Sequence, residues 1–341
     1  MSKINLLTIH WGKCYGAVMQ TYATCKLLEE AGHKVNVINL IHPSVKNAYK
    51  RCRRWVDLFR EFQFYLFKKN YFSHLTTKTY SVEFDKLPPT DYYVVGSDQV
   101  WNRDITKPFY LDYFLQFVPN TAKRVSLSSS FGKQIWNEED EITNQVALEL
   151  KKFSAISVRE DSGVEILQNS FALTATQLPD PTIGYGKFEQ LLPNRKEKHQ
   201  LFTFLFKNTP ETRAIVESCA KELHVPIHKN SRFNIYLKNG PIDWLSNIAN
   251  SEFVITDSFH GLALSLIFNK QFLVLCADER KFTRLESLLR LVGLENRYVK
   301  SYHDFEVMKM ELLKPIDYSN VNKILDSERK RYNHFIKQNI K

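Results

Sequence analysis

Glycine is scarce in this sequence, at 11 of 341 residues, whereas an average protein contains about 7%. Scarce glycine limits the loops that can wrap the backbone closely around phosphate groups. Neither G-x-G-x-x-G nor G-x-x-x-x-G-K-[ST] occurs in the chain. The commonest dinucleotide-binding and P-loop NTPase assignments therefore have no motif to support them.

Paired cysteines and long apolar runs are also lacking. The five cysteines are odd in number, widely spaced and without a C-x-x-C pair, which argues against a disulfide framework or a zinc site. We expect no bound metal. No apolar run approaches the ~18 residues of a membrane-spanning helix. The apolar stretch in MSKINLLTIHWGK is too short for a signal peptide, so we expect the first β-strand of a cytoplasmic protein.

The remaining composition is that of a folded protein with more than one domain. Hydrophobic residues make up 43% of the chain and charged residues 25%, as in ordinary globular proteins. The length exceeds the ~250 to 300 residues at which a single core stops growing. The 47 Lys and Arg against 37 Asp and Glu give a net charge of +10, which favours an anionic partner.

A strand followed by a helix recurs along the chain. Residues 6–9 are apolar, residues 17–28 carry apolar side chains at helical spacing, and residues 35–40 alternate like a strand. This pattern predicts a βαβ unit. Strand signals followed by loops or helices return at 92–102, 123–132 and 154–167, and a second series begins at residue 201. Repeated βα units predict parallel sheets covered by helices.

A polar stretch punctuated by proline and glycine, at 184–200, separates the two series. We therefore predict two Rossmann-like α/β domains, at 1–185 and 186–315, with a helical insertion at about 44–85 and a closing helix at 316–341. Ligands bind at the carboxyl ends of the strands in open parallel sheets. Two such sheets facing each other would place a site in the cleft between the domains.

Polar residues follow the predicted strand at 253–255 and precede an almost wholly apolar helix. Thr256, Asp257 or Ser258 could cap that helix. His260 then falls in its first turn, where an imidazole could act as a base or donate a hydrogen bond to an anion. The alternative is a capped core helix whose histidine binds backbone carbonyls.

Two further groups of polar residues end strands in the first series. Arg159 follows the strand at 154–158, where its guanidinium could grip a phosphate or carboxylate with two hydrogen bonds; an ion pair with a nearby acid is the alternative. Asp98 and Asn102 could bind hydroxyls, and Trp101 could stack on a sugar ring. The alternative there is a turn with Trp101 in the core.

Seven segments, in order from about residue 9 to residue 300, resemble the polysaccharide pyruvyl transferase family. They are CYGAVMQTYATCKLLEEAGHKVNVI, VVGSDQVWN, SSSFG, ISVRED, LPDPT, FVITDSFHGLALSLIFNKQFLVL and TRLESLLRLVGLENR. The ordered set is specific to the family but not to one acceptor sugar.

The resemblance implies a GT-B-like fold and the transfer of a carboxyethylidene group from phosphoenolpyruvate to two hydroxyls of one sugar. The product is a pyruvate ketal on a surface polysaccharide or its lipid-linked precursor, and no cofactor is needed. Two alternatives stay open. One is a GT-B glycosyltransferase that uses a nucleotide-sugar donor, and the other is a non-catalytic glycan-binding module.

The resemblance also implies roles for individual residues. His260 is similar to the family's catalytic histidine beside phosphoenolpyruvate, and Arg159 to its anion-binding arginine. Ser258 and Phe259 are expected to line the donor site. Some family members have arginine where this chain has Ser258, and our candidate replacement is Arg284, or its neighbours Arg280 and Lys281. We expect the acceptor to contact Asp98, Trp101, Asn102 and Gly16.

Residues 46–69 form a basic and aromatic segment with eight Lys and Arg against two acids. Six of its apolar residues follow helical spacing and predict one apolar face: Trp55, Leu58, Phe59, Phe62, Tyr65 and Leu66. Such a helix could rest on anionic lipid at the inner face of the membrane, close to a lipid-linked acceptor. The alternative, which general experience of amphipathic helices favours, is an insertion packed on the first domain with a solvated basic side. No nucleic-acid-binding motif accompanies the charge, so we expect no nucleic-acid partner.

Overall fold

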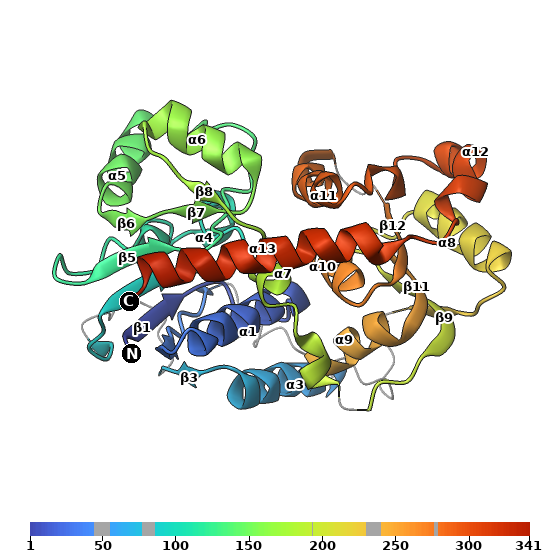
Figure 1. Ribbon diagram of the computed structural model, residues 1–341, viewed down its shortest axis with the longest axis horizontal. Helices are drawn as coiled ribbons and strands as arrows, with labels where there is room; N and C mark the ends of the chain where they lie inside the picture. Colours follow the sequence, from blue (N-terminus) through green and yellow to red (C-terminus); the bar gives the residue numbers. More distant parts are fainter. Residues whose placement is uncertain (44–54, 77–85, 193, 230–239, 276–278) are drawn as a thin grey trace. The chain divides into compact units, whose positions relative to one another are not determined.

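The chain folds into two compact units. The computed structural model describes residues 1–43, 55–76, 86–192, 194–229, 240–275 and 279–341 (Figure 1). Unit 1 comprises Met1–Tyr185 together with Glu328–Lys341, and unit 2 comprises Gly186–Ser327. Each unit is a parallel α/β layer structure, as the recurring strand and helix signals predict.

Unit 1 is built on a six-stranded parallel sheet with the order β3-β2-β1-β4-β5-β6. Its strands are β1 (Lys3–Leu7), β2 (Lys34–Val37), β3 (His74–Leu75), β4 (Tyr92–Val95), β5 (Lys123–Ser126) and β6 (Phe153–Ala155), and a smaller parallel sheet pairs β7 (Ser157–Val158) with β8 (Thr176–Gln177). All four residues of β4 are buried. A central parallel strand is covered on both faces, which explains its unbroken apolar sequence.

The helices of unit 1 cover this sheet. They are α1 (Tyr15–Glu30), α3 (Trp55–Tyr71), α4 (Arg103–Thr106), α5 (Asp140–Leu150), α6 (Asp161–Phe171) and α7 (Pro181–Tyr185). A 3-10 turn lies at Leu111–Phe114 in unit 1, and two more lie at Phe188–Leu191 and Glu295–Arg297 in unit 2. Helix α1 is almost entirely buried. It ends just before Gly32, whose φ of +90° is the left-handed conformation that glycine adopts most easily after a helix.

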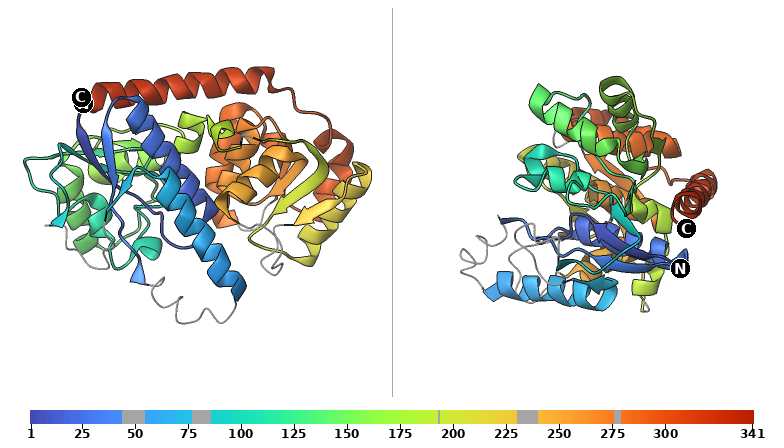
Figure 2. Two further views of the ribbon diagram at one scale, coloured as in Figure 1. Left: turned by 90° about the horizontal axis from the view of Figure 1, so that it is seen from below. Right: turned by 90° about the vertical axis from the view of Figure 1, so that its left-hand side faces the viewer.

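Helix α3 packs on unit 1 through a different face from the one predicted. Phe64 and Phe67 are each 2% exposed. The ring centroid of Phe64 lies 5.1 Å from that of Tyr15 on α1, and the ring centroid of Phe67 lies 6.2 Å from that of Tyr22 on the same helix. Figure 2 shows α3, in light blue, running alongside the dark blue α1. Of the predicted apolar face, Leu58, Phe59, Phe62 and Tyr65 do lie on one side of the helix but are exposed, whereas the packing uses a second apolar face on the opposite side that the sequence analysis did not identify. The predicted segment begins at residue 46, and residues 46–54 lie outside the described residues.

Unit 2 is built on a five-stranded parallel sheet with the order β10-β9-β11-β12-β13. The strands are β9 (Lys198–Phe204), β10 (Ile227–Lys229), β11 (Ser251–Thr256), β12 (Gln271–Leu275) and β13 (Tyr298–Val299), and the helices are α8 (Pro210–Glu222), α9 (Pro241–Asn250), α10 (Phe259–Ile267), α11 (Glu279–Val292) and α12 (Tyr302–Leu312). β11 is central, between β9 and β12. Every residue of α10 is buried, as its apolar sequence predicts.

The last helix, α13 (Tyr318–Asn339), begins in unit 2 and ends in unit 1. Its Tyr332 is fully buried and its hydroxyl lies 3.2 Å from the Ser128 hydroxyl. Gly184 makes room for that ring, because a Cβ at Gly184 would lie 2.7 Å from the Tyr332 Cδ2 atom. These contacts attach the second half of α13 to the core of unit 1.

The described residues offer neither a membrane-spanning helix nor a cluster of metal ligands. Among the helices described, none is both long and apolar enough to cross a membrane. The same residues contain no group of three or more His, Cys, Asp and Glu side chains able to hold a metal ion.

Candidate active site

In unit 2, the polar junction between β11 and α10 positions His260. Ser258 caps the helix, with its hydroxyl accepting the Gly261 N–H at 3.4 Å. His260 is the second residue of α10 and is 7% exposed. Phe259 stands edge-on to the imidazole, with ring centroids 5.3 Å apart. Of the three capping candidates, the structure selects Ser258.

Gly261 lets α10 start close to the end of β11. A Cβ at this position would lie only 2.5 Å from the Thr256 hydroxyl oxygen, a distance that real side chains do not tolerate. The Thr256 hydroxyl also donates to the Phe204 carbonyl at 2.8 Å and accepts the Ser258 N–H at 3.1 Å. The close approach of helix and strand therefore determines where the imidazole of His260 lies.

Asp257 organises the neighbouring strand end and does not cap α10. Its carboxylate accepts the Phe206 N–H at 2.8 and 3.0 Å and the Lys207 N–H at 3.1 Å. Phe206 and Lys207 lie two and three residues beyond the end of β9. The carboxylate thus joins the loops that leave β11, the central strand of the sheet, and its neighbour β9.

Arg284, the candidate replacement cation, lies on α11, which packs against α10. Its side chain is half-buried. The contacts of Arg284 and Phe259 with the donor stay predictions. The side chains of Arg280 and Lys281 lie outside the described part of the chain.

In unit 1, Arg159 is buried within a network of carboxylates. Its Nε lies 2.7 Å from Glu160 Oε1, and its Nη1 lies 3.0 Å from Asp180 Oδ2. Burial opposes the charged form, but the attraction of Glu160, Asp180 and Asp98 outweighs it and raises the pKa of Arg159 above its usual value. The ion-pair alternative is the one realised in the structure. No observation here tests the predicted contact of Arg159 with an anionic donor.

Asp180 is the residue that sequence reasoning missed. Its carboxylate accepts the Ser97 hydroxyl at 2.9 Å, the Thr182 N–H at 2.9 Å and the Thr182 hydroxyl at 2.8 Å, in addition to Arg159. The side chain is completely buried. Asp180 stands in the LPDPT segment, so the signal was present in the sequence. Its partners Ser97 and Arg159, however, follow two different strands, β4 and β7, and could not be paired with it from the sequence.

Asp98 follows β4 at the same edge of the sheet. Its φ of +74° is uncommon outside glycine, although aspartate adopts it more readily than most residues. Asp98 Oδ1 accepts the Gln99 N–H at 2.9 Å, and its carbonyl accepts the Ser130 N–H at 3.1 Å. The side chain is half-buried, so solvent or a ligand can reach it. This carboxylate stays our predicted acceptor contact.

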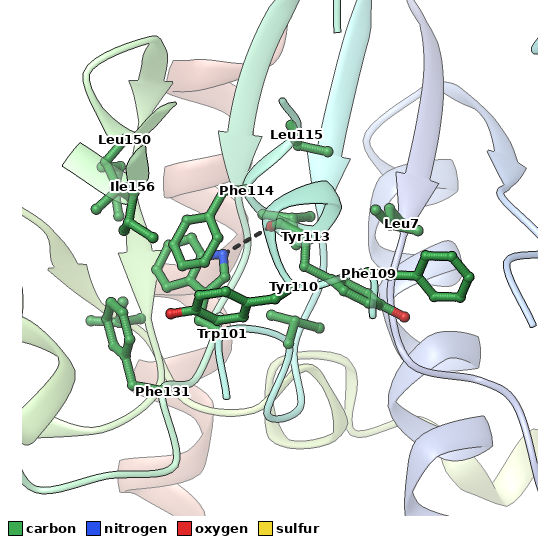
Figure 3. Close-up of a cluster of buried hydrophobic side chains, with 14 of the residues drawn as sticks. Leu7, Trp101, Phe109, Tyr110, Tyr113, Phe114, Leu115, Phe131, Leu150 and Ile156 are labelled. Atoms are coloured by element: carbon green, nitrogen blue, oxygen red, sulfur yellow. Dashed lines mark hydrogen bonds between the residues drawn. The ribbon is translucent and has the colours of Figure 1, made fainter. Parts of the chain in front are cut away.

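Trp101 does not present a face to a sugar. Its ring is 1% exposed and lies parallel to Phe114, with centroids 5.2 Å apart. The indole N–H donates to the Tyr113 carbonyl at 2.9 Å (Figure 3). Trp101 is therefore a core residue, and the predicted stacking role is wrong. Apolar packing on both faces of the ring prevented it from lining a polar loop.

Asn102 and Gly16 occupy helix starts. Asn102 caps α4, accepting the Asp104 N–H at 3.1 Å while its amide nitrogen donates to Gln99 Oε1 at 2.9 Å. Each end of this amide makes one hydrogen bond within the protein, and its contact with acceptor hydroxyls stays a prediction. Gly16 is the second residue of α1 and is buried. Its contact with the acceptor stays a prediction.

The two strand-end clusters differ in charge. Around Arg159, one guanidinium meets the carboxylates of Glu160 and Asp180, with Asp98 nearby, so the surroundings are net negative. Hydroxyl groups suit such a cluster, because carboxylates accept their hydrogen bonds. The start of α10 instead offers an imidazole and backbone N–H groups, which suit an anion.

Comparisons with known proteins agree with this architecture. The family model described as polysaccharide pyruvyl transferase matches residues 15–275, well over half of the chain. A UDP-GlcNAc 2-epimerase of Methanocaldococcus jannaschii superposes with a TM-score of 0.55 at 12% identity, covering 98% of this chain and 99% of that one. A protein of Listeria monocytogenes provisionally named a UDP-N-acetylglucosamine 2-epimerase gives 0.56 at 11% identity, covering 98% and 95%. A search of curated proteins gave no match. At these identities the likeness concerns the fold alone, which is GT-B-like as predicted.

Proposed function

Because the chain belongs to the polysaccharide pyruvyl transferase family, we propose that it moves a carboxyethylidene group from phosphoenolpyruvate onto two hydroxyls of one sugar. A proton adds to the methylene carbon of phosphoenolpyruvate, and a sugar hydroxyl attacks the adjacent carbon. The bond to phosphate then breaks, and a second hydroxyl closes the ketal ring. One hydroxyl proton ends on the new methyl group and the other on the released phosphate.

The observation that carries this proposal is the family match across the β11–α10 junction. His260 begins a buried helix there, and Ser258 holds the start of that helix in place. We assign His260 as the group that delivers the proton to the methylene carbon. The N–H groups at the start of α10 favour an anionic group of the donor.

The carboxylate cluster of unit 1 supports an acceptor role for that unit. Its net negative charge suits neutral sugar hydroxyls and disfavours phosphoenolpyruvate, which is strongly anionic. Asp98 is the reachable carboxylate of this cluster. Arg159 and Asp180 are buried behind it, and we assign them the role of positioning the strand ends.

The test is a kinetic comparison of His260→Ala and His303→Ala, with inorganic phosphate release and the ketal methyl signal as readouts. His303 is an exposed histidine on α12 of the same unit, so it controls for the loss of an imidazole. We expect His260→Ala to fold and to lose at least ~100-fold in kcat, the scale of positioned acid–base catalysis. His303→Ala should behave as wild type. Undiminished turnover in His260→Ala would reduce that residue to a structural role.

Asp98→Asn tests the acceptor assignment in the same assay. The substitution keeps the size of the side chain but removes its charge. We expect KM for the acceptor to rise while KM for phosphoenolpyruvate is unchanged. A change confined to the donor KM would contradict the assignment.

The same assay separates the alternatives. A glycosyltransferase would release a nucleoside diphosphate from a nucleotide sugar and no phosphate from phosphoenolpyruvate. A glycan-binding module would bind acceptor, but phosphoenolpyruvate would not raise its melting temperature, because only a ligand of the native state does so.

A further inference from the structure

Helix α3 has a second apolar face that points away from unit 1. Phe59 and Phe62 are 53% and 52% exposed, Tyr65 is 49% exposed and Leu58 is 44% exposed. At 3.6 residues per turn, these four positions fall on one side of the helix, opposite the buried Phe64 and Phe67. We call them the outer face of α3. Contiguous exposed apolar side chains of this kind mark interaction sites.

Two charged residues of α3, Arg60 and Glu61, contact other residues of unit 1. The Arg60 guanidinium lies over the Tyr15 ring, 5.0 Å from its centroid. Glu61 forms an ion pair with Lys13 at 3.1 Å. A helix that simply covers a domain has its charges in water and its apolar residues inside. On α3, Phe64 and Phe67 fill the side that packs on unit 1, and the outer face stays exposed in addition, so packing on unit 1 does not account for the outer face.

The net charge of the segment indicates what covers the outer face. The sequence of residues 46–69 carries eight Lys and Arg against two acids. In the described part, Lys68 and Lys69 stand in the last turn of α3, and Lys69 is exposed. Two copies of so basic a segment would repel each other. Aromatic and aliphatic side chains flanked by Lys and Arg are instead typical of helices that lie in the interface of an anionic bilayer.

We propose that the outer face of α3 docks the protein on an anionic phospholipid bilayer, with the helix lying in the plane of the surface. The aromatic side chains enter the boundary between headgroups and acyl chains, and the basic residues contact anionic headgroups. This binding goes beyond the proposed transfer reaction and does not depend on it. It would bring the enzyme to an acceptor carried on a lipid.

The experiment is co-sedimentation of the full chain with vesicles of phosphatidylglycerol and phosphatidylethanolamine, and with vesicles of phosphatidylcholine alone. We expect binding to the anionic vesicles that weakens as salt is raised, and little binding to the neutral ones. The double variant F59S/F62S should lose at least ~10-fold in vesicle affinity, because it removes the largest apolar groups from the outer face.

The matched control is V307S/M310S on α12, where the two side chains are 71% and 78% exposed. It removes comparable exposed apolar surface elsewhere and should bind vesicles as wild type does. Circular dichroism and thermal melting establish that both variants fold. Absence of salt-sensitive binding by the wild type would overturn the proposal, as would wild-type binding by F59S/F62S. Loss of a dimer in F59S/F62S with vesicle binding intact would assign the face to self-association.

Phosphate release with a water-soluble acceptor separates this proposal from the transfer reaction. F59S/F62S should retain that activity, because the outer face of α3 contains none of the residues assigned to donor or acceptor. Failure of the transfer reaction in the wild type would leave the vesicle result standing by itself.

Discussion

His10 allows the packing of unit 1 to be tested through its pH dependence. The residue follows β1 and is completely buried. Its Nδ1 lies 3.1 Å from the Thr8 carbonyl oxygen, and its Nε2 lies 3.1 Å from Asn39 Oδ1. Burial lowers the pKa of His10 from 6.5 to about 4, and the charge of Lys68 on α3 adds to this effect. The hydrogen bonds to Asn39 and Thr8 oppose it but are weaker.

The direction of this pH dependence follows from comparing the folded and unfolded states. Between these pKa values the unfolded chain binds a proton at His10 that the folded chain does not, so acid favours unfolding. The stabilisation of the folded state by neutral His10 is complete above pH 6.5 and is lost as the pH falls towards about 4. At about 1.4 kcal/mol per pKa unit, the loss is about 2 kcal/mol at pH 5 and about 3 kcal/mol in full.

Hydrogen exchange measured by mass spectrometry, on peptides from β1 and α1, reports the opening free energy of this region. We compare about pH 7.5 with about pH 5 for the wild type, His10→Gln and the exposed control His303→Ala. The decrease in opening free energy from the higher to the lower pH should be smaller by about 2 kcal/mol in His10→Gln than in the wild type, and should be unchanged in His303→Ala. Parallel pH profiles for the wild type and His10→Gln would refute the reasoning.

Two further predictions concern the strand ends. Gly261→Ala should lower the free energy of unfolding by about 1 to 3 kcal/mol and should lower kcat, because the added Cβ meets the Thr256 hydroxyl and displaces His260. The control is Gly163→Ala, whose Cβ would lie 3.1 Å from its nearest neighbour. It should be less destabilising in thermal unfolding. Equal costs would contradict the steric argument. Asp180→Ala should destabilise unit 1 by about 3 to 5 kcal/mol, since it leaves the buried Arg159 short of a partner, and Asp180→Asn should be milder in the same urea titration. If the two variants were equally stable, the network around Asp180 would not depend on the size and hydrogen bonding of its side chain.

Much of the fold could be predicted because its signals are local. Alternating strand and helix patterns, and the run of polar residues before a wholly apolar helix, depend on neighbours in the chain. They indicated the parallel sheets and the start of α10, where Ser258 and His260 indeed stand. The ordered family segments added the GT-B-like fold, which the comparisons confirm.

The errors arose where local patterns have two spatial outcomes. Trp101 stands among polar residues, and the sequence allowed either a binding loop or the core. The stacked Phe114 ring decided for the core. On α3, periodicity identified the apolar face that the structure leaves exposed. It did not identify the opposite face, which packs on Tyr15 and Tyr22 of α1.

The sequence by itself therefore determined the order of strands and helices, the family, and which residues stand at strand ends. Tertiary structure decided what those residues face. Arg159 is matched by Asp180, 21 positions away along the chain, and becomes part of an acidic cluster instead of an open anion site. Burial and charge compensation depend on contacts between distant segments. Local sequence patterns do not contain that information, because they record only what each residue requires and not which partner supplies it.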